Sequence, residues 1–168
     1  MFGDKRGKAV DAIVDGLKPV IRFSAMHGGL PAGYWQDPYV LGFIQGCVFK
    51  IGEHAGLKTD SASAWIEAYE QLSDGQGKAV VTRIRELNRP PRDKDLLLGM
   101  GNAVFCVPYA LGLEDYPDEP VILRARKAGS DYATVFGHTD RKNPERTRTA
   151  GALIHILFHN IVSERLGH

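Results

Sequence analysis

The sequence lacks two features that would each indicate a class of function. There is no excess of charge, because 21 Lys and Arg residues face 20 Asp and Glu residues, for a net charge of +1. Dedicated DNA- and RNA-binding domains usually carry a strong basic excess, so nucleic acid is not an expected partner. Long apolar runs are missing too: the longest, 39–51 and 96–111, are shorter than the ~20 residues that span a bilayer. We therefore expect no membrane segment.

Cysteine is scarce. Cys47 and Cys106 both lie within apolar segments, and there is no CxxC pair or Cys–His spacing of the kind that forms a zinc knuckle. Buried free thiols are typical of a reducing compartment. The N-terminal segment has basic residues but no apolar stretch after them, so the sequence predicts no signal peptide. These observations together predict a soluble, cytoplasmic protein.

Catalytic signatures are also missing. The chain has no GxSxG turn, no Walker loop and no HExxH pair. Gly99 and Gly101 do not extend to a GxGxxG motif, because Val104 stands where the third glycine would be. The leading interpretation is a small helical interaction or regulatory module without catalytic activity, acting as a homo-oligomer or with a protein partner.

Glycine, in contrast, is abundant: it accounts for 19 of the 168 residues, about 11% where ~7% is usual. Four glycines, Gly42, Gly46, Gly99 and Gly101, fall inside two apolar helical segments, where each costs ~1 kcal/mol relative to Ala. We expect these four positions to lie at a close contact between two helices.

Hydrophobic spacing predicts a single all-α domain over 1–168, a compact bundle of five or six helices. The helices expected over 38–55 and 96–111 are apolar nearly all round, which is typical of helices surrounded by others. The segment 120–137 stays open between a helix that ends near Gly129 and a small β-hairpin. Further expected elements are an apolar stripe over 10–21 that is kinked or split at Pro19, one or two helices within 61–88, and a last helix over 144–166.

The helices over 38–55 and 96–111 resemble each other. Each starts at an acidic residue, Asp37 in the first and Asp93 or Asp95 in the second. An amide follows in each, Gln45 and Asn102, at an offset of 57 residues that could reflect an internal duplication. A buried amide without partners costs ~1–3 kcal/mol. The two amides therefore either form hydrogen bonds that fix the helix register or line a cavity for a small apolar ligand.

Histidines give the best candidate for chemistry. His155 and His159 are four residues apart on one helix and therefore share a face, as two ligands of one metal ion must. His54 could supply a third ligand to a divalent transition metal such as zinc, nickel or manganese. In these three positions the residue order resembles that of small metal-binding four-helix bundles such as the DinB-like group. The alternative is that both paired histidines bond to backbone or solvent at the edge of the apolar face.

Arginines form two basic clusters. Arg83 and Arg85 belong to one, and Arg146 and Arg148 lie at the start of the last helix, where positive charge opposes the helix dipole. These four residues therefore predict an anion- or nucleic-acid-responsive site, with a small anion as the simpler ligand. Two alternatives are a solvated charged face and pairing with the acidic segment 113–119 of the same chain.

Overall fold

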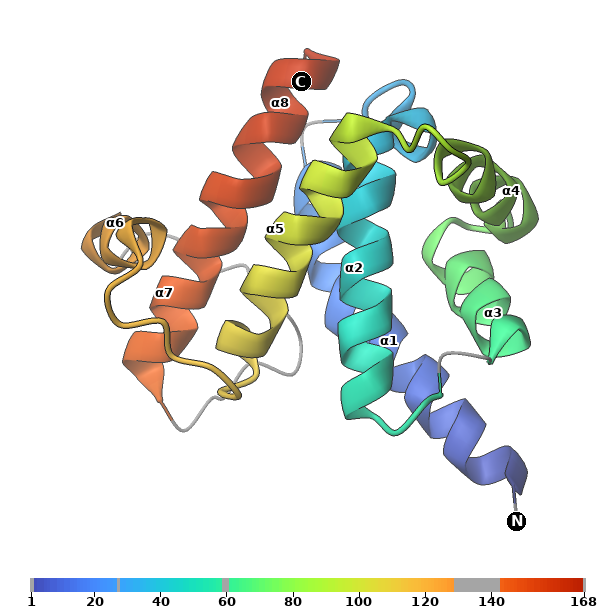
Figure 1. The fold of residues 1–168 in the computed structure, drawn as a ribbon, viewed down its shortest axis with the longest axis horizontal. Helices are drawn as coiled ribbons and strands as arrows, with labels where there is room; N and C mark the ends of the chain where they lie inside the picture. Colours follow the sequence, from blue (N-terminus) through green and yellow to red (C-terminus); the bar gives the residue numbers. More distant parts are fainter. Residues whose placement is uncertain (1, 27, 59–60, 129–142, 168) are drawn as a thin grey trace.

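The computed structural model describes residues 2–26, 28–58, 61–128 and 143–167, and the regular structure in these ranges is entirely helical (Figure 1). The all-α class predicted from the sequence is confirmed there, with seven helices rather than five or six when the continuous α7, η2 and α8 are counted as one. None of the described helices is long and apolar enough to cross a bilayer. The elements are α1 (Phe2–Ser24), the 3₁₀ turn η1 (Tyr34–Gln36), α2 (Pro38–His54), α3 (Ala62–Leu72), α4 (Gly77–Leu87), α5 (Lys94–Ala110), α6 (Pro120–Ala128), α7 (Pro144–Ile154), the π-helical turn η2 (His155–His159) and α8 (Asn160–Leu166).

Helices α2 and α5 form the centre of the molecule, and aspartates start both. The Asp37 carboxylate accepts hydrogen bonds from the backbone amides of Tyr39 and Val40. The Asp93 carboxylate does the same for two amides at the start of α5. Each cap satisfies amides that have no partner within the first turn of a helix. Of the two caps expected for the second helix, the structure therefore uses Asp93 and starts α5 at Lys94.

The contact between α2 and α5 is close because glycines lie at the crossing. A Cβ atom built at Gly42 would overlap the carbonyl group of Leu96. In return, a Cβ atom built at Gly99 would overlap the carbonyl oxygen of Tyr39. Further along, a Cβ atom at Gly46 would lie 2.6 Å from the Cβ of Ala103. Early residues of α2 thus meet early residues of α5, so the two helices run parallel. Three of the four glycines expected at a close contact lie there.

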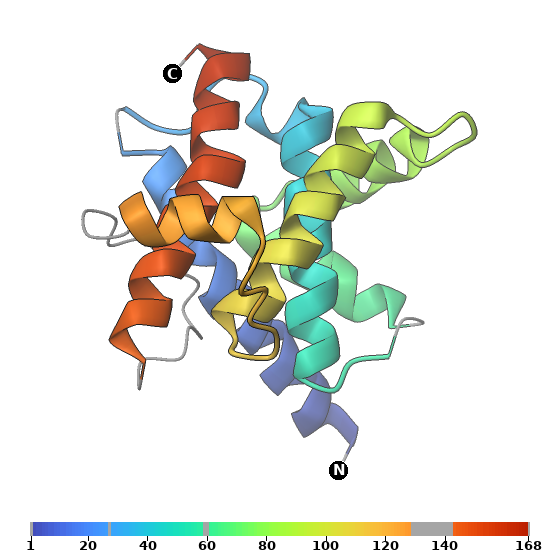
Figure 2. The same cartoon turned by 60° about the vertical axis from the view of Figure 1, so that its left-hand side comes forward.

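The other helices surround α2 more completely than α5. Helix α1 packs against α2 and α3, and α3 packs against α4. On the other side, α5 contacts the helix formed by α7, η2 and α8, which run on without a break (Figure 1). Helix α6 packs across α7, as the turned view shows (Figure 2). The side of α5 that faces the viewer in Figure 1 has no described helix in front of it.

Three expectations need correction. Helix α1 is one continuous helix with Pro19 inside it, so the alternative of two short helices is wrong. Buried residues on both sides of the proline, including Leu17 and Ile21, hold the two halves against the core. Helix α5 is not surrounded, because Leu97, Leu98 and Val104 are exposed. Gly101 has open space around it, in contrast to the close contact expected.

The segment 120–137 is helical over 120–128, which is the first of the two alternatives for these residues. The remainder of the expected β-hairpin, 129–137, lies outside the described residues.

Candidate functional site

The three histidines of the expected metal site do not come together. The ring of Phe158, next to His159, stacks on Phe43 of α2 with ring centroids 4.2 Å apart. His54 ends α2 eleven residues beyond Phe43, about 16 Å further along the helix. Zn–N bonds are only ~2.0–2.1 Å long. Among the described residues, no group of three His, Cys, Asp or Glu side chains is placed to hold a metal ion.

His155 and His159 instead share a small pocket beside the end of α1. The pocket has a volume of about 220 Å³ and is also lined by Phe23 and Ser24. The ring centroids of the two histidines are 6.2 Å apart, and the ring of Phe23 lies 4.4 Å from that of His159. The Ser24 hydroxyl is 3.3 Å from Nδ1 of His159, whereas Nε2 of His159 is buried without a hydrogen-bond partner in the described part of the chain.

Burial controls the charge of both histidines. The pKa of His159 falls to about 3, because burial disfavours its charged form and the neighbouring His155 adds to the effect. Burial also lowers the pKa of His155. Both rings are therefore neutral near pH 7, so the pocket presents no positive charge to an anion.

The four arginines of the expected anion site lie on different sides of the molecule. Arg83 and Arg85 belong to α4, whereas Arg146 and Arg148 belong to α7, with α2 and α5 between them (Figure 1). Arg83 pairs with Glu86 one turn later, at 3.4 Å. The four side chains therefore do not form one site.

Arg146 pairs with the acidic segment of its own chain, which is one of the alternatives left open by the sequence. Its guanidinium donates hydrogen bonds to the carbonyl oxygens of Tyr109 and Glu114 at 2.9 and 3.0 Å. It also lies 3.3 Å from the Asp115 carboxylate and 4.8 Å from the centre of the Tyr109 ring. These contacts tie the start of α7 to the end of α5, so Arg146 has a structural role.

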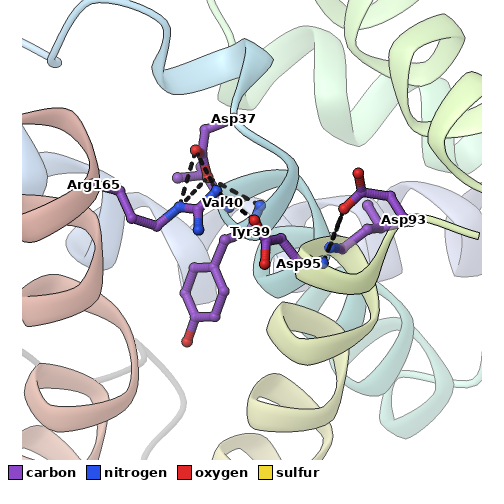
Figure 3. A network of polar contacts seen from close by, with 7 residues as sticks. Asp37, Tyr39, Val40, Asp93, Asp95 and Arg165 are labelled. Carbon is purple, nitrogen blue, oxygen red and sulfur yellow. Dashed lines mark hydrogen bonds and ion pairs between the residues drawn. The ribbon is translucent and has the colours of Figure 1, made fainter.

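A second arginine, which the sequence did not single out, joins three helices. Arg165 of α8 bonds to both carboxylate oxygens of Asp37 and lies 2.9 Å from the Asp95 carboxylate (Figure 3). Its guanidinium lies 5.8 Å from the centre of the Tyr39 ring. Hydrogen bonding to Asp37 raises the pKa of Arg165. The end of α8 is thereby fixed to the starts of α2 and α5.

The amide of Asn102 finds its partner in the same region. Its Nδ2 atom donates to the Tyr39 hydroxyl at 2.6 Å, and that hydroxyl donates in turn to the carbonyl oxygen of Leu157 in the π-helical turn. Burial raises the pKa of Tyr39 to about 12, so the hydroxyl keeps its proton. For Asn102 the hydrogen-bonding alternative therefore describes the structure better than the cavity alternative.

Gln45 has a different environment, which we call the Trp65 pocket. It lies between α2, α3 and α4 and has a volume of about 260 Å³. The Oε1 atom of Gln45 lies 3.5 Å from Nδ2 of Asn88, which is long for a hydrogen bond. The indole Nε1 of Trp65 and the hydroxyl of Tyr69 are buried without a hydrogen-bond partner among the described residues. The residues that line the Trp65 pocket include Gln45, Phe49, Trp65, Tyr69, Arg85 and Asn88.

The second feature that the sequence did not indicate is the outer face of α5. We use this name for the surface formed by Leu97, Leu98, Gly101, Val104 and Phe105, of which Phe105 is half-buried and stacks on the ring of Tyr116 with ring centroids 4.5 Å apart. The exposed fractions of Leu97, Leu98 and Val104 are 41, 55 and 42%. The sequence carries no charged residue from Leu96 to Leu113, so the helix has no polar side to turn to water.

Comparisons with known proteins add no assignment. No protein-family model, no curated protein and no solved structure matches the chain.

Proposed function

We propose that this chain is a helical interaction module without catalytic activity, and that it associates with a second copy through the outer face of α5. The observation that carries the proposal is the uncovered apolar face of α5. Large contiguous apolar patches are rare on monomers and mark interaction surfaces. The net charge of +1 produces little repulsion between two copies.

The outer face of α5 is complementary to itself. In an antiparallel pair of α5 helices centred on Gly101, Leu98 meets Val104 of the other copy, and Leu97 meets Phe105. Each exposed leucine thus packs on an apolar side chain. Gly101 lies at the twofold axis, where its open surroundings allow the two helices to approach closely. Such a contact uses the same patch twice, as closed twofold dimers require.

Charge placement supports this arrangement. Lys94 lies seven residues before Gly101 and Pro108 lies seven residues after it, so an antiparallel pair brings Lys94 to the level of Pro108 in the other copy. The backbone amide of Glu114 bonds to the carbonyl oxygen of Pro108, which places the exposed Glu114 at that level. Two Lys94–Glu114 pairs, one at each end, would therefore flank the apolar centre.

The test is the mass of the protein as a function of concentration. Helix α5 has 17 residues, about 25 Å in length, which makes a small interface with a Kd on the order of 10 µM. Sedimentation equilibrium should show a monomer–dimer transition in this range. Leu98→Glu should remove the dimer, because it places a charge in the apolar centre.

A matched control is available on α6. Leu123 is 52% exposed, close to the 55% of Leu98, but lies away from the outer face of α5, so Leu123→Glu should leave the dimer intact. Lys94→Glu should weaken the dimer, and combining it with Glu114→Lys should restore it. A chain that stays monomeric at millimolar concentration would refute the proposal. Equal effects of the two leucine variants would refute the assigned surface.

A further inference from the structure

We infer that the Trp65 pocket binds a small organic acid with an apolar body. The inference is independent of the proposed dimer, because none of the residues that line this pocket belongs to α5. The occupant is small, since about 260 Å³ is below the ~300–1,000 Å³ of pockets that hold drug-sized ligands. Its body is apolar because Phe49, Trp65 and Tyr69 supply much of the wall.

Unsatisfied hydrogen-bond donors are the first argument. Trp65 and Tyr69 are one turn apart on α3 and therefore lie on one face of the helix. Both are at least nine-tenths buried, and neither the indole Nε1 nor the hydroxyl has a hydrogen-bond partner in the described chain. Buried Trp and Tyr usually find partners for these groups, and an unmet donor costs ~1–3 kcal/mol. Both side chains border the Trp65 pocket but their polar atoms are closed to solvent, so a small rotation of either side chain has to expose its donor before an acceptor oxygen of a ligand satisfies it.

The positive charge of Arg85 at the pocket favours an acid over a neutral ligand. Arg85 lines the pocket from α4 as an exposed side chain, and it forms no ion pair within 4 Å with a carboxylate of the described residues. Of the acids on the nearby helices, Glu86 pairs with Arg83 and Glu67 pairs with Arg6 at 2.7 Å, whereas the Glu70 carboxylate lies beside Gly77 at the start of α4. A carboxylate is the planar anion that a guanidinium binds through two parallel hydrogen bonds.

The probe is phenylacetate, which combines one ring with one carboxylate. The chain has two tryptophans, and Trp35→Phe leaves Trp65 as the one indole while it keeps an aromatic ring at position 35. Titration should change the Trp65 fluorescence in a saturable way, with a Kd on the order of 1 mM or below, as expected for a ligand of this size. The indole NH signal in an NMR spectrum of the unsubstituted protein gives the same readout without the Trp35 change.

Three comparisons test the chemistry. Arg85→Gln should weaken binding about tenfold, which is the effect of one charge-assisted contact, whereas Arg89→Gln, a matched change just beyond α4, should not. Phenylacetamide, which lacks the charge, should also bind about tenfold more weakly. Ala62→Phe, at an exposed position on the pocket edge, should block binding without affecting the core.

The inference is overturned if phenylacetate causes no saturable change at Trp65 up to about ten times the expected Kd. It is also overturned if Ala62→Phe binds as well as the unsubstituted protein, since the ligand would then lie elsewhere. Equal affinity for phenylacetamide would refute recognition of an anion. Because Leu98→Glu affects only the dimer, ligand binding by that variant should be unchanged, which separates this result from the test of the proposed function.

Discussion

Two alanine substitutions on α5, two residues apart, should change stability in opposite directions. At Gly99 a Cβ atom would overlap the carbonyl oxygen of Tyr39 and lie 2.7 Å from the amide nitrogen of Phe43. At Gly101 a Cβ atom would meet nothing within 4 Å. Both positions lie in the interior of the same helix, so the gain in helix propensity is the same for both. The difference between the two variants therefore measures the close contact with α2.

The magnitudes follow from two terms. Replacing a helical glycine by alanine stabilises by ~1 kcal/mol, which is the full effect at Gly101 and should raise the Tm by roughly 2–4 °C in a chain of this size. At Gly99 the added methyl group forces α2 and α5 apart. Overpacking costs ~1–3 kcal/mol, and more where the opposing atoms are backbone, so we expect a net loss of about 2 kcal/mol and a Tm lower by roughly 4–8 °C.

The assay is thermal and urea unfolding at a concentration where sedimentation shows a monomer, because Gly101 lies at the centre of the proposed dimer. Gly42→Ala provides a second test, since its Cβ atom would meet Leu96 in the reciprocal way. We expect it to destabilise by a similar amount. If Gly99→Ala were as stable as the unsubstituted protein, the close crossing of α2 and α5 would be wrong.

Three further predictions concern the polar network, the histidine pocket and the thiols. Arg165→Met should lower the free energy of unfolding by about 2 kcal/mol, because it leaves the largely buried Asp37 without its charged partner. An unchanged urea midpoint would show that this contact does not stabilise the fold. Burial lowers the pKa of His159 to about 3 in the folded protein, below the ~6.5 of an unperturbed histidine. Its contribution to stability is therefore complete above pH 6.5 and is lost as the pH falls towards 3, at ~1.4 kcal/mol per pH unit. Urea unfolding between pH 7 and pH 4 should show a steeper loss for the unsubstituted protein than for His159→Leu, and parallel curves would contradict the low pKa. Burial raises the pKa of both Cys47 and Cys106, so neither thiol should react with an aromatic disulfide reagent until urea unfolds the chain; rapid labelling of the folded protein would refute their burial.

Local signals in the sequence were sufficient for the central helices. An aspartate followed by an apolar segment predicts a capped helix start, and Asp37 and Asp93 cap α2 and α5. The glycines within these apolar segments predicted a close contact, and Gly42 and Gly99 form it. Such signals succeed because a cap and a helical glycine depend on a few neighbouring residues or on one partner helix.

Long-range placement was not accessible in the same way. The spacing of His155 and His159 gives the face that they share, but it does not say which part of α2 lies against their helix: Phe158 stacks on Phe43, whereas His54 ends α2. Likewise, Trp65 and Tyr69 have the spacing of an ordinary core stripe. Their unsatisfied polar atoms become visible only when the neighbouring helices are in place. Such spacing indicates that Trp65 and Tyr69 are buried, as they are, but it does not indicate that they line a pocket.

The exposed face of α5 follows from how the chain connects two parallel helices. After α2 ends, the chain must return to the opposite end of the molecule before α5 can run alongside it, and α3 and α4 make that return. They cover one side of α2, and α1 covers another. Among the described residues after α5, the helix formed by α7, η2 and α8 packs against one side of α5. The segments that form α2 and α5 are similarly apolar in the sequence, since each helix buries a face against the other. For α5, however, the described residues leave Leu97, Leu98 and Val104 exposed on the outer face, which the proposed dimer would cover with a second copy of α5.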